Sequence, residues 1–225
     1  MNAAKKRETA HEYFENENYE KAAELLETIL ETDEGEIEDL QNLMMCHFLD
    51  ENDEKWMGLA QTILQNPEAT IEDKRSVFSM YMLSENFDHA IDLGKAICAD
   101  ASAEKEDRQD LLLCLFSAEN YEEAIQVGEA LIQEEGSDML DFQILRDAYS
   151  MIDNNERAVE LGEIVLQNPE ADLKDKLALA SNYLALEKFD QAQKLIEEVL
   201  KNPKDMDEDD KEIAQDLLEE IKASK

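Results

Sequence analysis

A short phrase recurs every 34 residues, and this period constrains the fold more than any other feature of the chain. The phrase begins with Asn at 18, 86, 120 and 154 and ends in Ala, and its final alanines occupy five of six positions in register, namely Ala22, Ala90, Ala124, Ala158 and Ala192. The sixth position in this register holds Trp56. A period of this length, kept without slippage over six copies, is typical of stacked helical hairpins rather than of one closed core.

Other positions repeat with the same spacing and predict helices. Apolar pairs follow each phrase, for example Ile29/Leu30 and Val165/Leu166. A mostly aromatic register precedes it, made of Tyr13, His47, Tyr81, Leu115, Tyr149 and Tyr183. Within 120–133 the apolar side chains fall at the spacing of one helical face. Only 6 Gly and 3 Pro occur in 225 residues, which also favours helix throughout.

The repeat resembles that of the tetratricopeptide family, whose unit is two antiparallel helices with an aromatic residue in the first and an aromatic-x-x-Ala motif at the start of the second. Pro67, Pro169 and Pro203 close three of the repeats, as is common in that family. The resemblance covers about nine-tenths of the chain and implies an all-α fold, a right-handed α-solenoid of six helical hairpins with a C-terminal capping helix. We therefore expect a single solenoid domain over 1–225, with repeats 3–36, 37–70, 71–104, 105–138, 139–172 and 173–206 and the capping helix at 207–222.

The chain departs from the family pattern in the first helix of each hairpin, where a small residue is usual. Here the register reads Ala10, Met44, Phe78, Leu112, Arg146 and Ala180. Sixteen residues later the second helix has Leu26, Ala60, Gly94, Gly128, Gly162 and Ile196, so a small residue always accompanies a large one. We expect the two positions to touch and share a fixed volume, because interiors are close-packed. The alternative is that the glycines make room for the next hairpin.

The turns and the C-terminus also follow from the repeat. Acidic-Asn pairs such as Glu17–Asn18 predict the turn within each hairpin, with Asn adopting the left-handed conformation and capping the next helix. Ile213, Leu217, Leu218 and Ile221 form a stripe that we expect to cover the last hairpin. The segment 64–69 recurs identically at 166–171, a displacement of 102 residues that indicates duplication of a three-repeat block.

The charge of the chain limits its partners. The sequence contains 57 acidic and 21 basic residues, a formal net charge of −36. Such a chain repels phosphate backbones and anionic lipids, so nucleic acid and membrane are not expected partners and a basic polypeptide is favoured. No apolar run approaches the ~18 residues needed to span a bilayer, and an acidic amphipathic stretch follows the N-terminal Lys5–Arg7. These features predict a cytoplasmic protein.

The sequence lacks the motifs of nucleophilic, phosphate and zinc chemistry, so we expect no enzyme, no cofactor and no metal site. Cys46 and His47 are adjacent and would diverge on a helix, which favours packing roles over shared metal binding. Cys46, Cys98 and Cys114 are expected to be reduced and buried. The acidic segment 205–210 imitates the start of a calcium loop, but it lacks the turn glycine and fits a helix cap better.

The resemblance places the partner-binding groove on the first helices of the hairpins. In register, the groove-facing residues are Arg7, His11, Phe14, Asn42, Met45, Phe48, Leu49, Arg75, Met82, Leu83, Leu113, Phe116, Asp147 and Met151. Their Met and aromatic side chains suit an apolar peptide or helix. Phe14, Phe48 and Phe116 could equally tuck between neighbouring hairpins.

The predicted function is a scaffold or adaptor that binds a protein or peptide, with a basic or amphipathic segment in the concave groove. The alternative is a self-associating structural or regulatory subunit whose groove is covered by another chain. Binding of chaperone tails is not expected, because Glu72 and Ser76 stand where that sub-family carries its third-repeat Lys and Arg. The sequence names neither the partner nor the oligomeric state.

Overall fold

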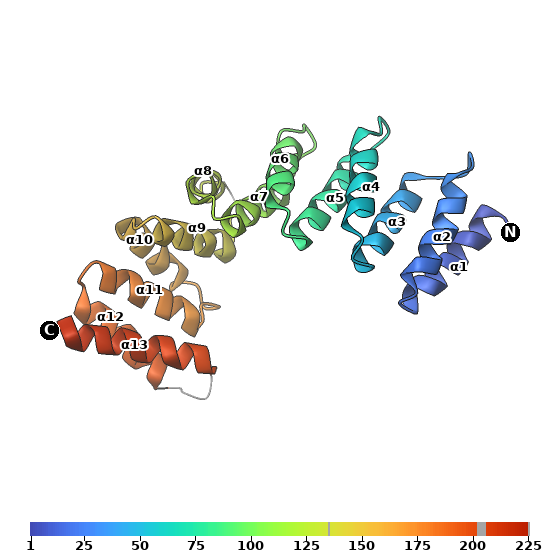
Figure 1. Cartoon of the computed structure of the whole chain (residues 1–225). Coiled ribbons are helices and arrows are strands. Elements are labelled where there is room, and N and C mark those ends of the chain that lie inside the picture. The colour runs from blue at the N-terminus through green and yellow to red at the C-terminus, as the bar shows by residue number, and fades with distance from the viewer. Residues whose placement is uncertain (135, 202–205, 225) are drawn as a thin grey trace. The chain divides into compact units, whose positions relative to one another are not determined.

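The computed structural model describes residues 1–134, 136–201 and 206–224 (Figure 1). Over these residues the structure consists of helices joined by short turns. Six helical hairpins are formed by α1 (Ala3–Glu15) and α2 (Tyr19–Leu30), α3 (Ile37–Leu49) and α4 (Asp53–Gln65), α5 (Ile71–Leu83) and α6 (Phe87–Cys98), α7 (Lys105–Ser117) and α8 (Tyr121–Leu131), α9 (Met139–Met151) and α10 (Asn155–Val165), and α11 (Leu173–Ala185) and α12 (Phe189–Leu200), after which comes α13 (Glu208–Ser224). The first helices all begin 34 residues apart, which confirms the predicted all-α repeat fold.

The chain divides into two compact units, which we call unit 1 (Met1–Ala103) and unit 2 (Glu104–Lys225). The boundary falls between the third and fourth hairpins, where the 102-residue displacement also places the edge of the duplicated block. In both copies of the recurring segment the turn is closed in the same way, with Glu68 and Glu170 donating their N–H groups to the side chains of Asn66 and Asn168. The single domain over 1–225 stays a prediction.

The turn within every hairpin is a left-handed helix cap, and here the sequence prediction was wrong in one detail. The residue with positive φ is the acidic one, not Asn, in all six turns: Glu17, Glu51, Glu85, Glu119, Asp153 and Glu187. The N–H of Asn18 bonds to the carbonyl of Tyr13 and that of Glu17 to the carbonyl of Phe14, the pattern of a Schellman motif. Because that motif places the left-handed conformation one residue before its last donor, Asn18 keeps a negative φ and caps α2.

Each first helix after α1 begins with a capping box. An Asp in the third helical position, for example Asp39 or Asp73, accepts the backbone N–H of the N-cap residue, whose own side chain accepts in return. The predicted Asn caps of the second helices are confirmed at Asn18, Asn52 and Asn154, whose side chains accept the N–H three residues on. The prediction is wrong at Asn86 and Asn120, whose side chains make no such bond although both residues occupy the N-cap position.

The capping helix forms as predicted, with one residue exchanged. Leu217 and Ile221 are buried against α11 and α12, and Figure 1 shows α13 lying along these helices. Ile213 is instead 47% exposed, and Ala214 takes its place in the core. The buried face runs through Asp210, Ala214, Leu217 and Ile221, so it keeps the predicted direction but is narrower than the predicted stripe. Pro203 and Asp205, which the sequence analysis singled out, lie outside the described residues.

The predicted contact between the two paired positions is present in unit 2, but it is not the tightest one. An added methyl group on Gly128 would approach Leu112 within 3.4 Å, whereas it would approach Leu145 of the next hairpin within 2.9 Å. Gly162 repeats the arrangement, at 3.4 Å from Arg146 and 3.0 Å from Leu179. The glycines therefore make room for a side chain of their own hairpin and for one of the next hairpin, and the side chain of the next hairpin lies closer.

Gly128→Leu is expected to lower the free energy of unfolding by roughly 1–3 kcal/mol, because a larger side chain overpacks this site. Urea unfolding measures the loss. Leu145→Ala and Leu112→Ala are each destabilising by themselves, so the effect is read from double-mutant cycles. Gly128→Leu should cost less in the Leu145→Ala background than in the Leu112→Ala background, since Leu145 is the nearer neighbour. Equal costs in the two backgrounds would contradict the order of the distances.

A second contact between neighbouring hairpins involves the aromatic register. Tyr149 donates its hydroxyl to Glu129 at 2.9 Å, and Tyr183 donates to Glu163 at 2.5 Å. Burial and the neighbouring carboxylate of Glu163 raise the pKa of Tyr183 to about 12. A group whose folded pKa lies above its unfolded value contributes stability that is complete below the unfolded pKa, near 10, and is lost as pH rises toward the folded one.

Tyr183→Phe should accordingly cost roughly 1 kcal/mol near neutral pH, the net worth of one hydrogen bond, and progressively less between about pH 10 and pH 12. The measurement is the difference in unfolding free energy between variant and parent across this range. The comparison cancels the titration of lysines, which both proteins share. A difference independent of pH would show that the Tyr183 hydroxyl does not carry the contact.

Candidate functional site

All fourteen predicted groove residues lie on first helices, from α1 to α9, and none of them is buried. Unit 1 carries ten of them and unit 2 carries Leu113, Phe116, Asp147 and Met151. The structure brings four together around one cavity, namely Arg7, His11, Phe14 and Asn42. The exposed members of the whole set are His11, Asn42, Leu49, Leu83, Leu113 and Met151, and the rest are half-buried.

This cavity, which we call the hairpin-1 pocket, lies between α1, α2 and α3 and has a volume of about 480 Å³. Besides the four predicted residues it is lined by Ala10, Glu15, Ala22, Leu26, Glu38, Asp39 and Cys46. Sequence reasoning missed these residues. The signal for them was Ala10 itself, a small side chain at a register position where the next four repeats carry Met, Phe, Leu and Arg.

Arg7 is tied into the structure at the rim of the pocket. Its guanidinium donates to both carboxylate oxygens of Asp39, at 2.8 and 2.7 Å, and to the backbone carbonyl of Glu34 at 2.6 Å. The hydrogen bond to Asp39 raises the pKa of Arg7. Burial alone would raise the pKa of Asp39, but the hydrogen bonds from Arg7 and from the backbone of Glu36 outweigh it and hold that pKa below its usual value. The charge of Arg7 is therefore compensated within the chain.

An equivalent hydrogen bond to Asp, donated by Gln instead of Arg, joins other neighbouring hairpins, so this contact belongs to the packing of the repeats. Gln41 donates to Asp73, Gln109 to Asp141 and Gln143 to Asp175, each at 2.8 Å. In every case the acceptor is the Asp that caps the next first helix. The fifth position of the first helix thus links consecutive repeats.

The three Phe residues are neither fully open in the groove nor fully tucked between hairpins, the two predicted alternatives. Phe14, Phe48 and Phe116 are half-buried, and each meets an aromatic ring of its own hairpin edge-on. The ring centroids of Phe14 and Tyr19 lie 5.4 Å apart. The packing restrains the rings while leaving part of each at the surface.

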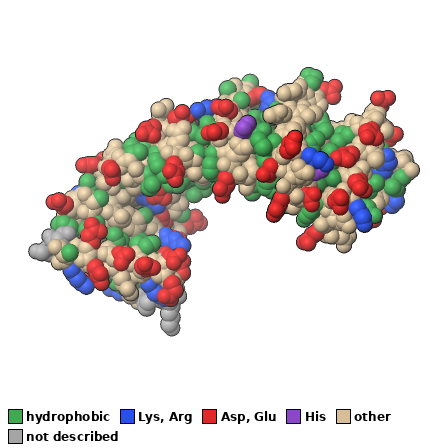
Figure 2. All heavy atoms as spheres, in the orientation of Figure 1, with side chains coloured by type: hydrophobic (Ala, Val, Ile, Leu, Met, Phe, Trp, Pro, Cys, Tyr) green, Lys and Arg blue, Asp and Glu red, His purple; other side chains and the backbone are tan. Residues whose placement is uncertain are grey.

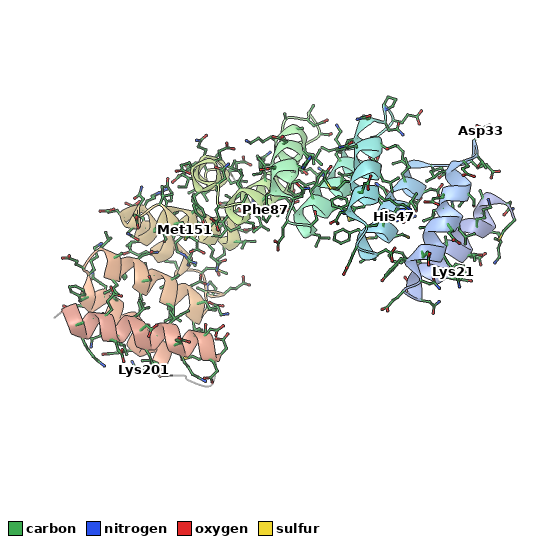
Figure 3. All side chains as sticks on the ribbon, viewed as in Figure 1. Lys21, Asp33, His47, Phe87, Met151 and Lys201 are labelled. Atoms are coloured by element: carbon green, nitrogen blue, oxygen red, sulfur yellow. The ribbon has the colours of Figure 1, made fainter. Side chains whose placement is uncertain are left out.

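A row of apolar side chains continues from the pocket along unit 1. Leu49 and Leu83 end α3 and α5 in the same register and are 40% and 66% exposed. Met45, Phe48 and Met82 beside them are half-buried. Figure 2 shows hydrophobic side chains reaching the surface among the acidic ones. In unit 2, Leu113 and Met151 are exposed, the latter at the end of α9 where Figure 3 labels it.

The residues considered for metal binding and nucleophilic chemistry pack inside the fold. Cys46 and His47 (labelled in Figure 3) are both buried on α3, as predicted. Burial raises the pKa of the Cys46 thiol to about 11, which keeps it protonated at neutral pH. Cys114 is buried likewise, whereas Cys98 is only half-buried, against the expectation, and within the described residues none of the three forms a disulfide. Across the described residues, no three His, Cys, Asp or Glu side chains are grouped to hold a metal ion.

Two further observations bear on the acidic and apolar segments. Asp207 and Asp210 cap α13 reciprocally, each side chain accepting the backbone N–H of the other, so this part of the calcium-like segment is a helix cap. Among the helices described, we find none whose length and apolar character together would let it cross a bilayer.

No family model matches the sequence, and no curated protein matches it. Solved structures do resemble it. The C-terminal part of a TPR repeat-containing protein from Cytophaga hutchinsonii has a TM-score of 0.69 at 17% identity, over 87% of this chain and 78% of that one. A tetratricopeptide repeat protein from Parabacteroides merdae has a TM-score of 0.54 at 18% identity, over 98% and 84%. A chain from the structure of Naa15/Naa10 bound to HypK-THB has a TM-score of 0.57 at 17% identity, over 87% of this chain but only 30% of that one.

Proposed function

We propose that this chain, which has the tetratricopeptide-repeat fold, is a protein-interaction scaffold that binds a polypeptide on the first helices of its hairpins. The observation that carries the proposal is the surface of unit 1, where the open hairpin-1 pocket is continued by the exposed Leu49 and Leu83. Exposed apolar side chains repeated in register on one set of helices suit an apolar or amphipathic partner. The similar chain in the Naa15/Naa10 structure comes from a protein assembly, which supports this class of function by analogy of fold.

The charge of unit 1 makes the partner a basic or amphipathic segment. Its sequence holds 24 acidic and 8 basic residues. Several of the cations are already paired within the unit, as Arg7 is with Asp39 and Lys5 with Glu8. Lysine or arginine in the partner would gain from this field, whereas an acidic segment would be repelled.

The proposal is tested with two labelled amphipathic peptides, one of Lys and Leu and one of Glu and Leu. The Lys/Leu peptide should bind in a fluorescence-anisotropy titration, and Leu49→Ser with Leu83→Ser should weaken it about tenfold, or ~1.4 kcal/mol. Ile164→Ser is the control, because Ile164 is also an exposed apolar residue but lies on the second helix α10. Equal loss in the control and the double variant would count against a site on the first helices.

Self-association is the second candidate, since a second copy could cover the same apolar row. Sedimentation velocity distinguishes the two functions. A monomer supports the scaffold with an open face, whereas a dimer that Leu83→Ser dissociates would support self-association through that face.

A further inference from the structure

The hairpin-1 pocket lies beside two small residues that face each other in the first repeat. Ala10 and Ala22 are both small and buried, and they lie on the facing helices α1 and α2. In the second repeat the two corresponding positions hold Met44 and Trp56, which are each 1% exposed. The first hairpin in turn has Leu26 where the second has Ala60, so Leu26 refills only part of the volume that Met44 and Trp56 occupy in the second repeat.

The walls of the pocket are apolar and pre-formed. Leu26 and Cys46 are buried, and their backbones belong to α2 and α3. Phe14 forms a third wall and is held edge-on against Tyr19. A pocket with fixed apolar walls favours a bulky apolar group, because burying that group releases water at no cost in reordering the protein.

The rim of the pocket is acidic once internal pairs are taken into account. Arg7 and Asp39 neutralise each other. Glu15 and Glu38 are exposed and line the opening, and within the described part of the chain neither forms an ion pair. Asn42 and His11 add polar groups beside them. Glu38 lies at the start of α3 and Glu15 at the end of α1, so cations on the two sides of the inserted apolar group would each meet one carboxylate.

We propose that the hairpin-1 pocket receives one bulky apolar side chain of a partner polypeptide, and that a Lys or Arg on one side of it in the partner contacts Glu38 while one on the other side contacts Glu15. This inference rests on the proposed function and adds its specificity: the partner is recognised by an apolar residue flanked by positive charge. The apolar row of Leu49 and Leu83 contributes affinity, whereas the pocket selects the anchoring side chain.

The test uses a set of labelled peptides in which lysines flank one central residue, which is Leu, Phe, Ala or Glu. The Leu or Phe peptide should bind at least about fivefold more tightly than the Ala peptide, and the Glu peptide should bind most weakly. Ala10→Met places in the first repeat the side chain that the second repeat carries, so it should fill the pocket and abolish the preference for Leu or Phe over Ala. Cys46→Val is the matched control on the pocket wall and should keep that preference, because it preserves the apolar volume.

Glu15→Gln with Glu38→Gln alters only exposed residues and therefore leaves the fold intact. This variant should weaken all lysine-flanked peptides about fivefold while keeping the preference for a bulky central residue. The inference is overturned if the Ala peptide binds the parent as tightly as the Leu peptide, or if Ala10→Met, shown by circular dichroism to be folded, retains the preference. It also fails if Ala10→Met does not fold and the two Gln changes leave affinity unaltered.

These outcomes separate the inference from the proposed function. If Leu49→Ser with Leu83→Ser weakens binding while the central residue of the peptide has no influence, the scaffold stands and the pocket assignment falls. If none of the lysine-flanked or Lys/Leu peptides binds, both fall.

Discussion

Trp56→Ala will lower the free energy of unfolding by about 3–5 kcal/mol, as expected for removal of a fully buried large aromatic side chain. Trp56 is 1% exposed on α4. Its ring meets Phe48 edge-on at 5.8 Å and lies against Tyr81 of the next hairpin at 5.5 Å, while its indole N–H donates to Asp53 at 3.1 Å. The change would leave a cavity between the second and third hairpins of unit 1.

This result would run against the repeat consensus, because the other five repeats have Ala in this register and consensus substitutions often stabilise. Trp56→Phe is the control, since it keeps an aromatic ring in place and should cost less than half as much. Urea unfolding monitored by circular dichroism measures both. A loss below about 1 kcal/mol for Trp56→Ala would show that the hairpins close over the site as they do around Ala in the other repeats.

Arg146→Ala is expected to cost about 3–5 kcal/mol, because it leaves a buried carboxylate without its cation. Arg146 is 5% exposed and donates to Asp175, itself 3% exposed, at 2.9 Å. It also donates to Asp147 at 2.8 Å. Among the described residues, the donors that remain to Asp175 after the change are the neutral amide of Gln143 and the backbone N–H of Asp172.

A second substitution separates loss of the ion pair from loss of packing. Adding Asp175→Asn to Arg146→Ala removes the unpaired buried charge, so the double variant should be more stable than Arg146→Ala alone. Gln143→Ala provides the comparison, because it removes a neutral donor to the same carboxylate and should cost only about 1 kcal/mol. A double variant that is no more stable than Arg146→Ala would assign the whole effect to the cavity.

The features that depend on neighbours along the chain could be predicted from the sequence. The first helices begin at the predicted 34-residue spacing, and the last hairpin is capped by a helix close to the predicted bounds. Cys46 and His47 pack inside the fold as expected. These predictions succeed because helix periodicity and capping are local, and because a repeat displays the same local information six times.

The candidate site was predictable only in part. Register alone placed Arg7, His11, Phe14 and Asn42 on the helices that border the hairpin-1 pocket. It did not show that Arg7 is neutralised by Asp39, because this bond links residues 32 positions apart in different hairpins. Nor did it show the pocket, which is a property of volumes that Ala10 and Ala22 fail to fill.

The sequence by itself determined the repeat, its helices and its net charge, since each of these is written in spacing and composition. Tertiary structure decided which side chains share space. The left-handed residue of each turn is acidic because the Schellman geometry places it one residue before Asn. The nearest side chain to Gly128 is Leu145 of the next hairpin rather than Leu112 of its own, because the closest approach is set by how hairpins stack. Such contacts depend on distances between helices, and the order of residues along the chain does not contain those distances.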